Sequence, residues 1–160
     1  MRIVIAAVGK LKDGAERELC ARYIERVASG GRGIGLGPVE VREIPEGRAA
    51  SMAARAADEA ERLLAKTKGT DVRILLDERG KAMTSAAFAT LLGNLRDRGV
   101  GEVAFILGGP DGHGDTARKA ATLLLSLGPM TLPHGLARIV LVEQIYRAAT
   151  ILAGHPYHRE

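Results

Sequence analysis

The histidines of this 160-residue chain are the side chains best suited to proton transfer near neutral pH, and all of them lie after position 112. They are His113, His134, His155 and His158, each in or beside a segment expected to be a loop. Loops at one end of a parallel sheet are where binding and catalytic groups collect. A metal site is not indicated, because Pro156 would break a helix that aligned His155 with His158 and no third ligand is evident. The pattern therefore predicts binding or proton-transfer chemistry without a metal ion.

Two glycine-rich segments are candidate ligand loops, and only one stands in the right context. Gly108–Gly114 follows an apolar strand pattern and opens a helical one, as a ligand loop does. Its match to the dinucleotide-binding fingerprint is weak, because no acidic residue lies about 20 positions later to hold a ribose. A turn with Asp111 and Asp115 as helix caps explains its glycines equally well. Ser29–Pro38 precedes a strand instead, which predicts a flexible connecting loop.

The final helical pattern, Leu136–Ala153, is more apolar than one face of a sheet requires. At about 100° per residue its polar side chains share one narrow sector, which contains Glu143, Gln144, Arg147 and Thr150. The remaining apolar surface predicts that a second copy of the chain packs there, giving a homodimer. Glu143 and Arg147 are four positions apart in the favourable order, which predicts an ion pair on the helix surface.

Arg138 is the exception on this helix, because it lies opposite the polar sector, between Val142, Ile145 and Ala149. An arginine is seldom buried without a partner. One interpretation is that its side chain extends past the helix end into water. The other is that it meets a carboxylate or a phosphate across a subunit interface.

The elements that position these residues follow from the alternation of apolar runs with helical patterns, which is typical of βαβ units around a mostly parallel sheet. We therefore predict an α/β fold. The expected strands are Arg2–Val8, Val39–Ile44, Val72–Asp77, Glu102–Leu107 and a weaker one near Ser126–Leu132. The expected helices are about Asp13–Ala28, Ala50–Lys68, Ser85–Arg98, Thr116–Leu124 and the final pattern.

The composition limits the number of domains and the classes of function that the chain can have. At 46% hydrophobic residues, 160 positions suffice for one domain with one core. The net charge of +4 permits attraction to a polyanion without establishing it, and the few aromatic residues disfavour an aromatic platform for single-stranded RNA. The lone Cys20 has no partner for an internal disulfide, and neither a signal peptide nor a membrane span is indicated. These features predict a cytoplasmic protein.

Three segments together carry a resemblance to a known family. They are ILGGPDG (Ile106–Gly112), MTLPHGLARIVLVEQIYRA (Met130–Ala148) and GHPYHRE (Gly154–Glu160). The chain resembles, over its whole length, the bacterial ribosomal RNA large subunit methyltransferase H family. That resemblance implies an S-adenosylmethionine-dependent enzyme that methylates N3 of a pseudouridine in 23S rRNA, on the ribosome. It also implies one SPOUT-class domain over residues 1–160, with a C-terminal trefoil knot that periodicity alone does not predict.

The resemblance further implies where the cofactor and the substrate bind. The cofactor residues it suggests lie in three loops and are Leu76, Gly109, Gly128, Pro129, Met130, Thr131, Leu132 and Pro133. Candidates for assisting proton loss from N3 are His134, His155 and His158, which the sequence does not rank. Candidate substrate contacts are Tyr157, which can stack on a base, and Arg138, Arg147 and Arg159, which can meet phosphate or the cofactor carboxylate.

Two other functions remain compatible with the residues. One is a non-catalytic RNA- or ribosome-binding protein that keeps the fold without binding cofactor, against which the intact loop Gly128–Pro133 argues. The other is a SPOUT methyltransferase that acts on transfer RNA. The RNA or particle that accepts a labelled methyl group distinguishes them.

Overall fold

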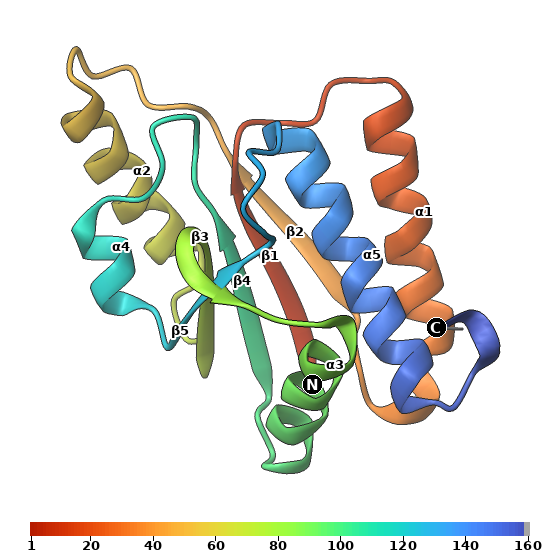
Figure 1. Cartoon of the computed structure of the whole chain (residues 1–160). Coiled ribbons are helices and arrows are strands. Elements are labelled where there is room, and N and C mark those ends of the chain that lie inside the picture. Colours follow the sequence, from red (N-terminus) through yellow and green to blue (C-terminus); the bar gives the residue numbers. More distant parts are fainter. Residues whose placement is uncertain (159–160) are drawn as a thin grey trace.

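Five parallel strands form one sheet in the computed structural model, which describes residues 1–158 (Figure 1). The strand order is β2-β1-β4-β3-β5, and every neighbouring pair runs parallel. The strands are β1 (Arg2–Val8), β2 (Val39–Ile44), β3 (Val72–Ala82), β4 (Glu102–Leu107) and β5 (Leu123–Ser126). The predicted α/β class with a parallel sheet is confirmed. The knot implied by the resemblance is consistent with this topology and stays a prediction.

Helices cover both faces of the sheet, which is why the central strands are apolar throughout (Figure 1). One face carries α1 (Ala15–Gly30), α3 (Ser85–Asp97) and α5 (His134–Leu152), and the other carries α2 (Met52–Lys66) and α4 (Asp115–Ala120). Side-chain hydrogen bonds cap the N-termini of two of these helices. The Ser51 side chain accepts the Ala54 amide at the start of α2, and the Thr84 side chain accepts the Ala87 amide at the start of α3.

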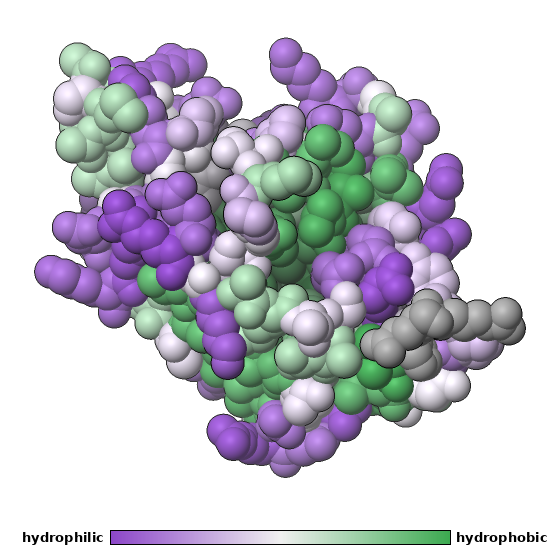
Figure 2. Space-filling model, viewed as in Figure 1, coloured by the Kyte–Doolittle hydropathy of each residue, from purple (hydrophilic) through white to green (hydrophobic). Residues whose placement is uncertain are grey.

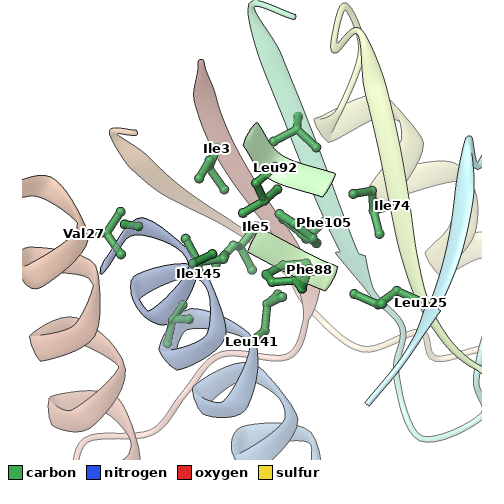
Figure 3. Close-up of a cluster of buried hydrophobic side chains, with 14 of the residues drawn as sticks. Ile3, Ile5, Val27, Ile74, Phe88, Leu92, Phe105, Leu125, Leu141 and Ile145 are labelled. Carbon is green, nitrogen blue, oxygen red and sulfur yellow. The ribbon is translucent and has the colours of Figure 1, made fainter. Parts of the chain in front are cut away.

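The larger core lies between the sheet and the three-helix face. Figure 3 shows Ile5 of β1 and Phe105 of β4 facing Leu141 and Ile145 of α5 and Phe88 of α3. All five side chains are buried. This packing fixes α5 against the sheet, so the loop that precedes α5 ends at a fixed position.

The predicted boundaries of the fourth helix and of the fifth strand are wrong. The fourth helix ends at Ala120 instead of Leu124, and the fifth strand runs over Leu123–Ser126 instead of Ser126–Leu132. A short apolar run does not distinguish a helix end from a strand by periodicity. Gly128, at a φ of 120°, and the prolines that follow it leave Gly128–Pro133 as a loop.

Strand β3 is longer than predicted and continues to Ala82. Its pairing with β5 shifts between Leu76 and Lys81, both of which lie opposite Leu125. Because Gly80 lies against the backbone of Leu124 and Leu125, a side chain there would collide with the neighbouring strand. The irregular stretch between Leu76 and Lys81 lies beside the candidate site.

Candidate active site

A cavity of about 500 Å³ opens where the carboxyl ends of β3, β4 and β5 meet. Its wall contains Leu76 after the regular part of β3, Gly109 after β4, and the whole of Gly128–Pro133 after β5. His134 and Ala137, from the first turn of α5, complete one side. The structure thus brings together the three loops that the resemblance had suggested for the cofactor. Ligands of open parallel sheets bind at this edge.

The loop Gly128–Pro133 presents backbone groups that a ligand can use. Among the described residues 1–158, the amides of Met130, Thr131 and Leu132 donate no hydrogen bond. Met130 is 77% exposed. A cavity of this volume with apolar walls and a few free polar groups is typical of small-molecule sites. It therefore fits a nucleoside ligand of the size of S-adenosylmethionine.

Gly109 is packed from behind by a buried carboxylate. Glu59 of α2 is 4% exposed; its Oε1 accepts the Gly47 amide at 2.7 Å, and its Oε2 lacks a partner within residues 1–158. A Cβ atom added at Gly109 would lie 2.7 Å from that Oε2 and 3.2 Å from a methyl carbon of Val8. A side chain at position 109 would therefore force the Glu59 carboxylate or the turn itself to move.

The turn Gly108–Gly114 is built differently from the predicted one. The Gly112 amide donates to the Gly109 carbonyl at 3.0 Å, which confirms a turn. Asp111 is paired with Arg55 of α2 at 2.6 Å, and no side chain caps α4, so the expected capping roles are wrong. The ion pair ties the outer part of this turn to α2.

Sequence reasoning missed a buried polar group beside the cavity, made of Asp77, His113 and Arg118. Arg118 donates to Asp77 at 2.8 Å, and the Nε2 atom of His113 lies 2.8 Å from the Leu76 carbonyl. Burial lowers the pKa of His113, which favours the neutral ring. Burial alone would raise the pKa of Asp77, but hydrogen bonds from the Arg79 amide and from Arg118 outweigh it, and the pKa is lowered. The available signal was an acidic residue directly after a buried strand.

Arg138 corrects both interpretations made from the sequence. Its side chain is 1% exposed, so the guanidinium neither extends into water nor lies at a surface where a phosphate could bind it. Its guanidinium binds Glu43 of the same chain and donates to the Gly9 carbonyl at 2.9 Å. The predicted carboxylate partner exists, but it belongs to β2 instead of a second subunit. A helical wheel shows which side a residue faces without showing what lies there.

His134 lies in the cavity wall, and its ring contacts Arg138 and the backbone of Val8. Arg138 donates to its Nε2 at 3.2 Å, and the ring also bonds the backbone of Val8. Burial and then the charge of Arg138 lower the pKa of His134. Since an arginine has no acceptor, Nε2 must carry the lone pair and Nδ1 the proton.

The C-terminal segment packs at the far end of α5. The ring of Tyr157, in the 3-10 helix Pro156–His158, lies 4.7 Å from that of Tyr146, which in turn lies 6.0 Å from that of Tyr23 in α1. All three tyrosines of the protein therefore form one cluster. Burial and a hydrogen bond with Tyr23 raise the pKa of Tyr157 to about 12, so its phenol stays protonated at neutral pH.

Arg147 and Glu143 extend this cluster. The predicted ion pair between them is confirmed at 2.7 Å, and the guanidinium of Arg147 lies 5.2 Å from the ring of Tyr157. His155 is exposed and its Nδ1 accepts the Tyr157 amide at 3.2 Å. His158 ends the described segment, and Arg159 lies outside it.

The cavity and Tyr157 lie at opposite ends of α5. A 19-residue helix is about 28 Å long. Figure 1 shows the dark blue segment after α5 at the opposite end of that helix from the loop before it. One chain therefore does not bring His155 or Tyr157 to its own cavity.

The described residues offer neither a metal-binding cluster nor a membrane-spanning helix. Within residues 1–158, no three His, Cys, Asp or Glu side chains come close enough together to hold a metal ion. No helix in the same part of the chain has the length and apolar character that crossing a membrane requires.

Comparisons with known proteins agree with this geometry. A family described as predicted SPOUT methyltransferase matches residues 1–158. Proteins named ribosomal RNA large subunit methyltransferase H are similar over 99% of both chains, with 49% identity for Brucella ovis, 50% for Xanthobacter autotrophicus and 47% for Bradyrhizobium diazoefficiens.

Solved structures share the fold at lower identity. A probable methyltransferase from Bordetella pertussis is 17% identical, has a TM-score of 0.56, and is matched over 92% of this chain and 96% of its own. A probable methylase family protein from Haemophilus influenzae is 12% identical, with a TM-score of 0.53 and coverage of 99% of this chain and 70% of its own.

The fold, the cavity at the carboxyl ends of β3, β4 and β5, and these relatives together define an α/β methyltransferase. The full-length match shows which one: the chain belongs to the SPOUT methyltransferase family. Its methyl donor is S-adenosylmethionine.

Proposed function

We propose that this protein methylates N3 of a pseudouridine in the 23S rRNA of assembled ribosomes, with S-adenosylmethionine bound in the 500 Å³ cavity. The observation that carries the proposal is the convergence of Leu76, Gly109 and Gly128–Pro133 on one cavity in a chain about half identical to named large-subunit rRNA methyltransferases. The proposed substrate places the protein in the cytoplasm, where ribosomes are.

Within the cavity, the free amides of Met130, Thr131 and Leu132 supply hydrogen bonds to the polar edge of the donor, while Leu76 and Leu132 enclose its apolar parts. S-adenosylmethionine supplies a methyl group on a sulfonium, which needs no further activation. The protein therefore has mainly to align the methyl carbon with N3 of the acceptor and to exclude water.

Methyl transfer forms the N3–C bond, breaks the S–C bond and releases the N3 proton. His134 is poorly placed to take that proton, because Arg138 occupies its only lone pair. The phenol of Tyr157 holds its own proton too tightly. His155 and His158 remain the candidate bases, with water as the final acceptor.

We propose that these two histidines act at a cavity only when two copies of the chain assemble. The exposed face of α5 carries Leu136, which is 42% exposed, and Val140, and Figure 2 shows hydrophobic atoms gathered over the first half of this helix. If two copies pack through this face with their α5 helices antiparallel, the tail of each lies beside the cavity of the other. We therefore propose a homodimer with two sites, each built from both chains.

Light scattering is expected to give about twice the 16.9 kDa mass of the chain. Leu136→Glu should give a monomer that stays folded, because the side chain is outside the core and its charge would be buried only at the dimer interface. Arg96→Lys, at the opposite end of the sheet, is the matched control and should stay dimeric. A wild-type monomer at micromolar concentration would refute the two-chain site.

The function itself is tested with ribosomes from a strain that lacks this protein. Labelled methyl groups should enter 23S rRNA, and mass spectrometry of the digested RNA should show N3-methylated pseudouridine. Transfer to tRNA instead of ribosomes would favour the transfer RNA alternative. Ribosome binding without donor binding or methyl transfer would favour a non-catalytic protein. Either outcome would overturn the proposal.

A further inference from the structure

Arg138 is the largest fully buried side chain among the described residues, and its contacts join three elements. From α5 it binds the carboxylate of Glu43 in β2 and the carbonyl of Gly9, which directly follows β1. Glu43 in turn accepts the Leu11 amide at 3.2 Å. The guanidinium thus fixes the start of α5 against the carboxyl ends of two strands.

Stability alone explains this arrangement poorly. A buried ion pair gains little over apolar residues of similar size, because both charges lose their hydration. The Nε atom of Arg138 also lacks a hydrogen-bond partner within residues 1–158, which adds to the cost. A costly buried group at the edge of a ligand cavity points to a role in that cavity.

Arg138 acts on the cavity through His134. The guanidinium donates to Nε2 of His134 at 3.2 Å, and the ring also contacts the backbone of Val8. The charged groups that face His134 are Arg138 from its own helix, Glu46 from the segment after β2, and Glu59 from α2. Burial and Arg138 outweigh the two carboxylates, so the ring stays neutral.

The same contact fixes the end of the donor loop. His134 is the first residue of α5 and directly follows Pro133, the last residue of the loop. The Ala137 amide donates to the Pro133 carbonyl at 2.9 Å, and both His134 and Ala137 line the cavity. A shift of Arg138 would therefore move one wall of the cavity and the loop attached to it.

We propose that Arg138 is a positioning residue for the methyl-donor site, which holds the ring of His134 in the cavity wall with Nε2 as hydrogen-bond acceptor and anchors the C-terminal end of the loop Gly128–Pro133. This inference rests on the proposed function in one respect, namely that the donor binds in this cavity. The positioning of His134 is independent of that function.

The first test is nitrogen NMR of the imidazole rings in the dimeric full-length protein. The His134 signals should show a protonated Nδ1 and an unprotonated Nε2 that stay unchanged from pH 8 to below the usual histidine pKa of about 6.5. In Arg138→Lys the ring should take a mixture of tautomers or begin to titrate. A wild-type His134 with the proton on Nε2 would overturn the proposal.

The second test is calorimetry with S-adenosylmethionine. We expect Arg138→Lys to weaken donor binding by roughly tenfold or more, because lysine lacks the fork that holds Glu43, Gly9 and His134 together. Arg96→Lys is the matched control: Arg96 also bonds one carbonyl and one carboxylate, but at the other end of the sheet, and its substitution should leave affinity unchanged. Equal affinity in Arg138→Lys and wild type would refute the positioning role.

Glu43→Gln provides a second variant should Arg138→Lys fail to fold. Glu43 is partly exposed, so its replacement by glutamine leaves Arg138 as the one buried charge that loses its partner. We expect roughly threefold weaker donor binding and a change in the His134 signals; unchanged signals and affinity would refute the proposal. If wild type binds no donor, the proposed function fails, while the NMR result still decides whether Arg138 holds His134.

Discussion

Removal of Tyr157–Glu160 is expected to reduce methyl transfer to ribosomes by roughly a hundredfold or more, the scale seen when acceptor alignment or proton transfer is lost. Tyr157 follows the end of α5, whereas the cavity lies at the start of this helix, which is about 28 Å long. Donor binding, measured by calorimetry, should therefore change little. Dimerisation should survive as well, because the exposed apolar residues lie near the start of α5.

A shorter deletion separates anchoring from chemistry. Removal of His158–Glu160 keeps Tyr157, whose ring packs on Tyr146 and against Arg147. We expect this variant to lose most of the activity too, if the last three residues act at the acceptor. Tyr157→Phe, which keeps the ring and loses the hydroxyl's hydrogen bonds with Glu143 and Tyr23, should stay within a few-fold of wild type. Near-parental methylation by either truncated protein would show that the tail is a surface feature.

Substitution of Gly109 by alanine is expected to weaken S-adenosylmethionine binding by roughly thirtyfold. The added Cβ collides with the buried carboxylate of Glu59, and such overpacking typically costs about 1–3 kcal/mol. The turn can relieve the collision by moving away from α2, but that movement carries it into the cavity. Calorimetry would measure the loss of affinity, and thermal unfolding would show how much of the strain remains in the free protein.

Gly114→Ala is the matched control within the same turn. Gly114 has a φ of −68°, and an added Cβ would make only ordinary contacts with Ala56 and Ala57 of α2. Its stability and donor affinity should stay close to those of wild type. If both substitutions left the affinity unchanged, the turn after β4 would not form part of the donor site.

Much of the candidate site could be anticipated because short motifs carry local chemistry. Gly109 stands in a turn after a buried strand, and the proline- and glycine-rich run Gly128–Pro133 cannot continue a strand. Their convergence with Leu76 follows from parallel pairing, which brings the carboxyl ends of β3, β4 and β5 to one edge. The group Asp77, His113 and Arg118 escaped notice because its members lie far apart in sequence.

The sequence by itself determined the α/β class, the first four strands and the apolar character of α5, because the period of apolar residues reflects which faces are buried. Only the packed structure shows the partners of Arg138, the buried carboxylate of Glu59 behind Gly109 and the distance between Tyr157 and the cavity of the same chain. Periodicity records that a side chain is covered, whereas its partner depends on which strand ends and helices meet there. For this reason the sequence left open an extension into water or a subunit interface for Arg138, whereas the structure shows an ion pair with Glu43 of the same chain.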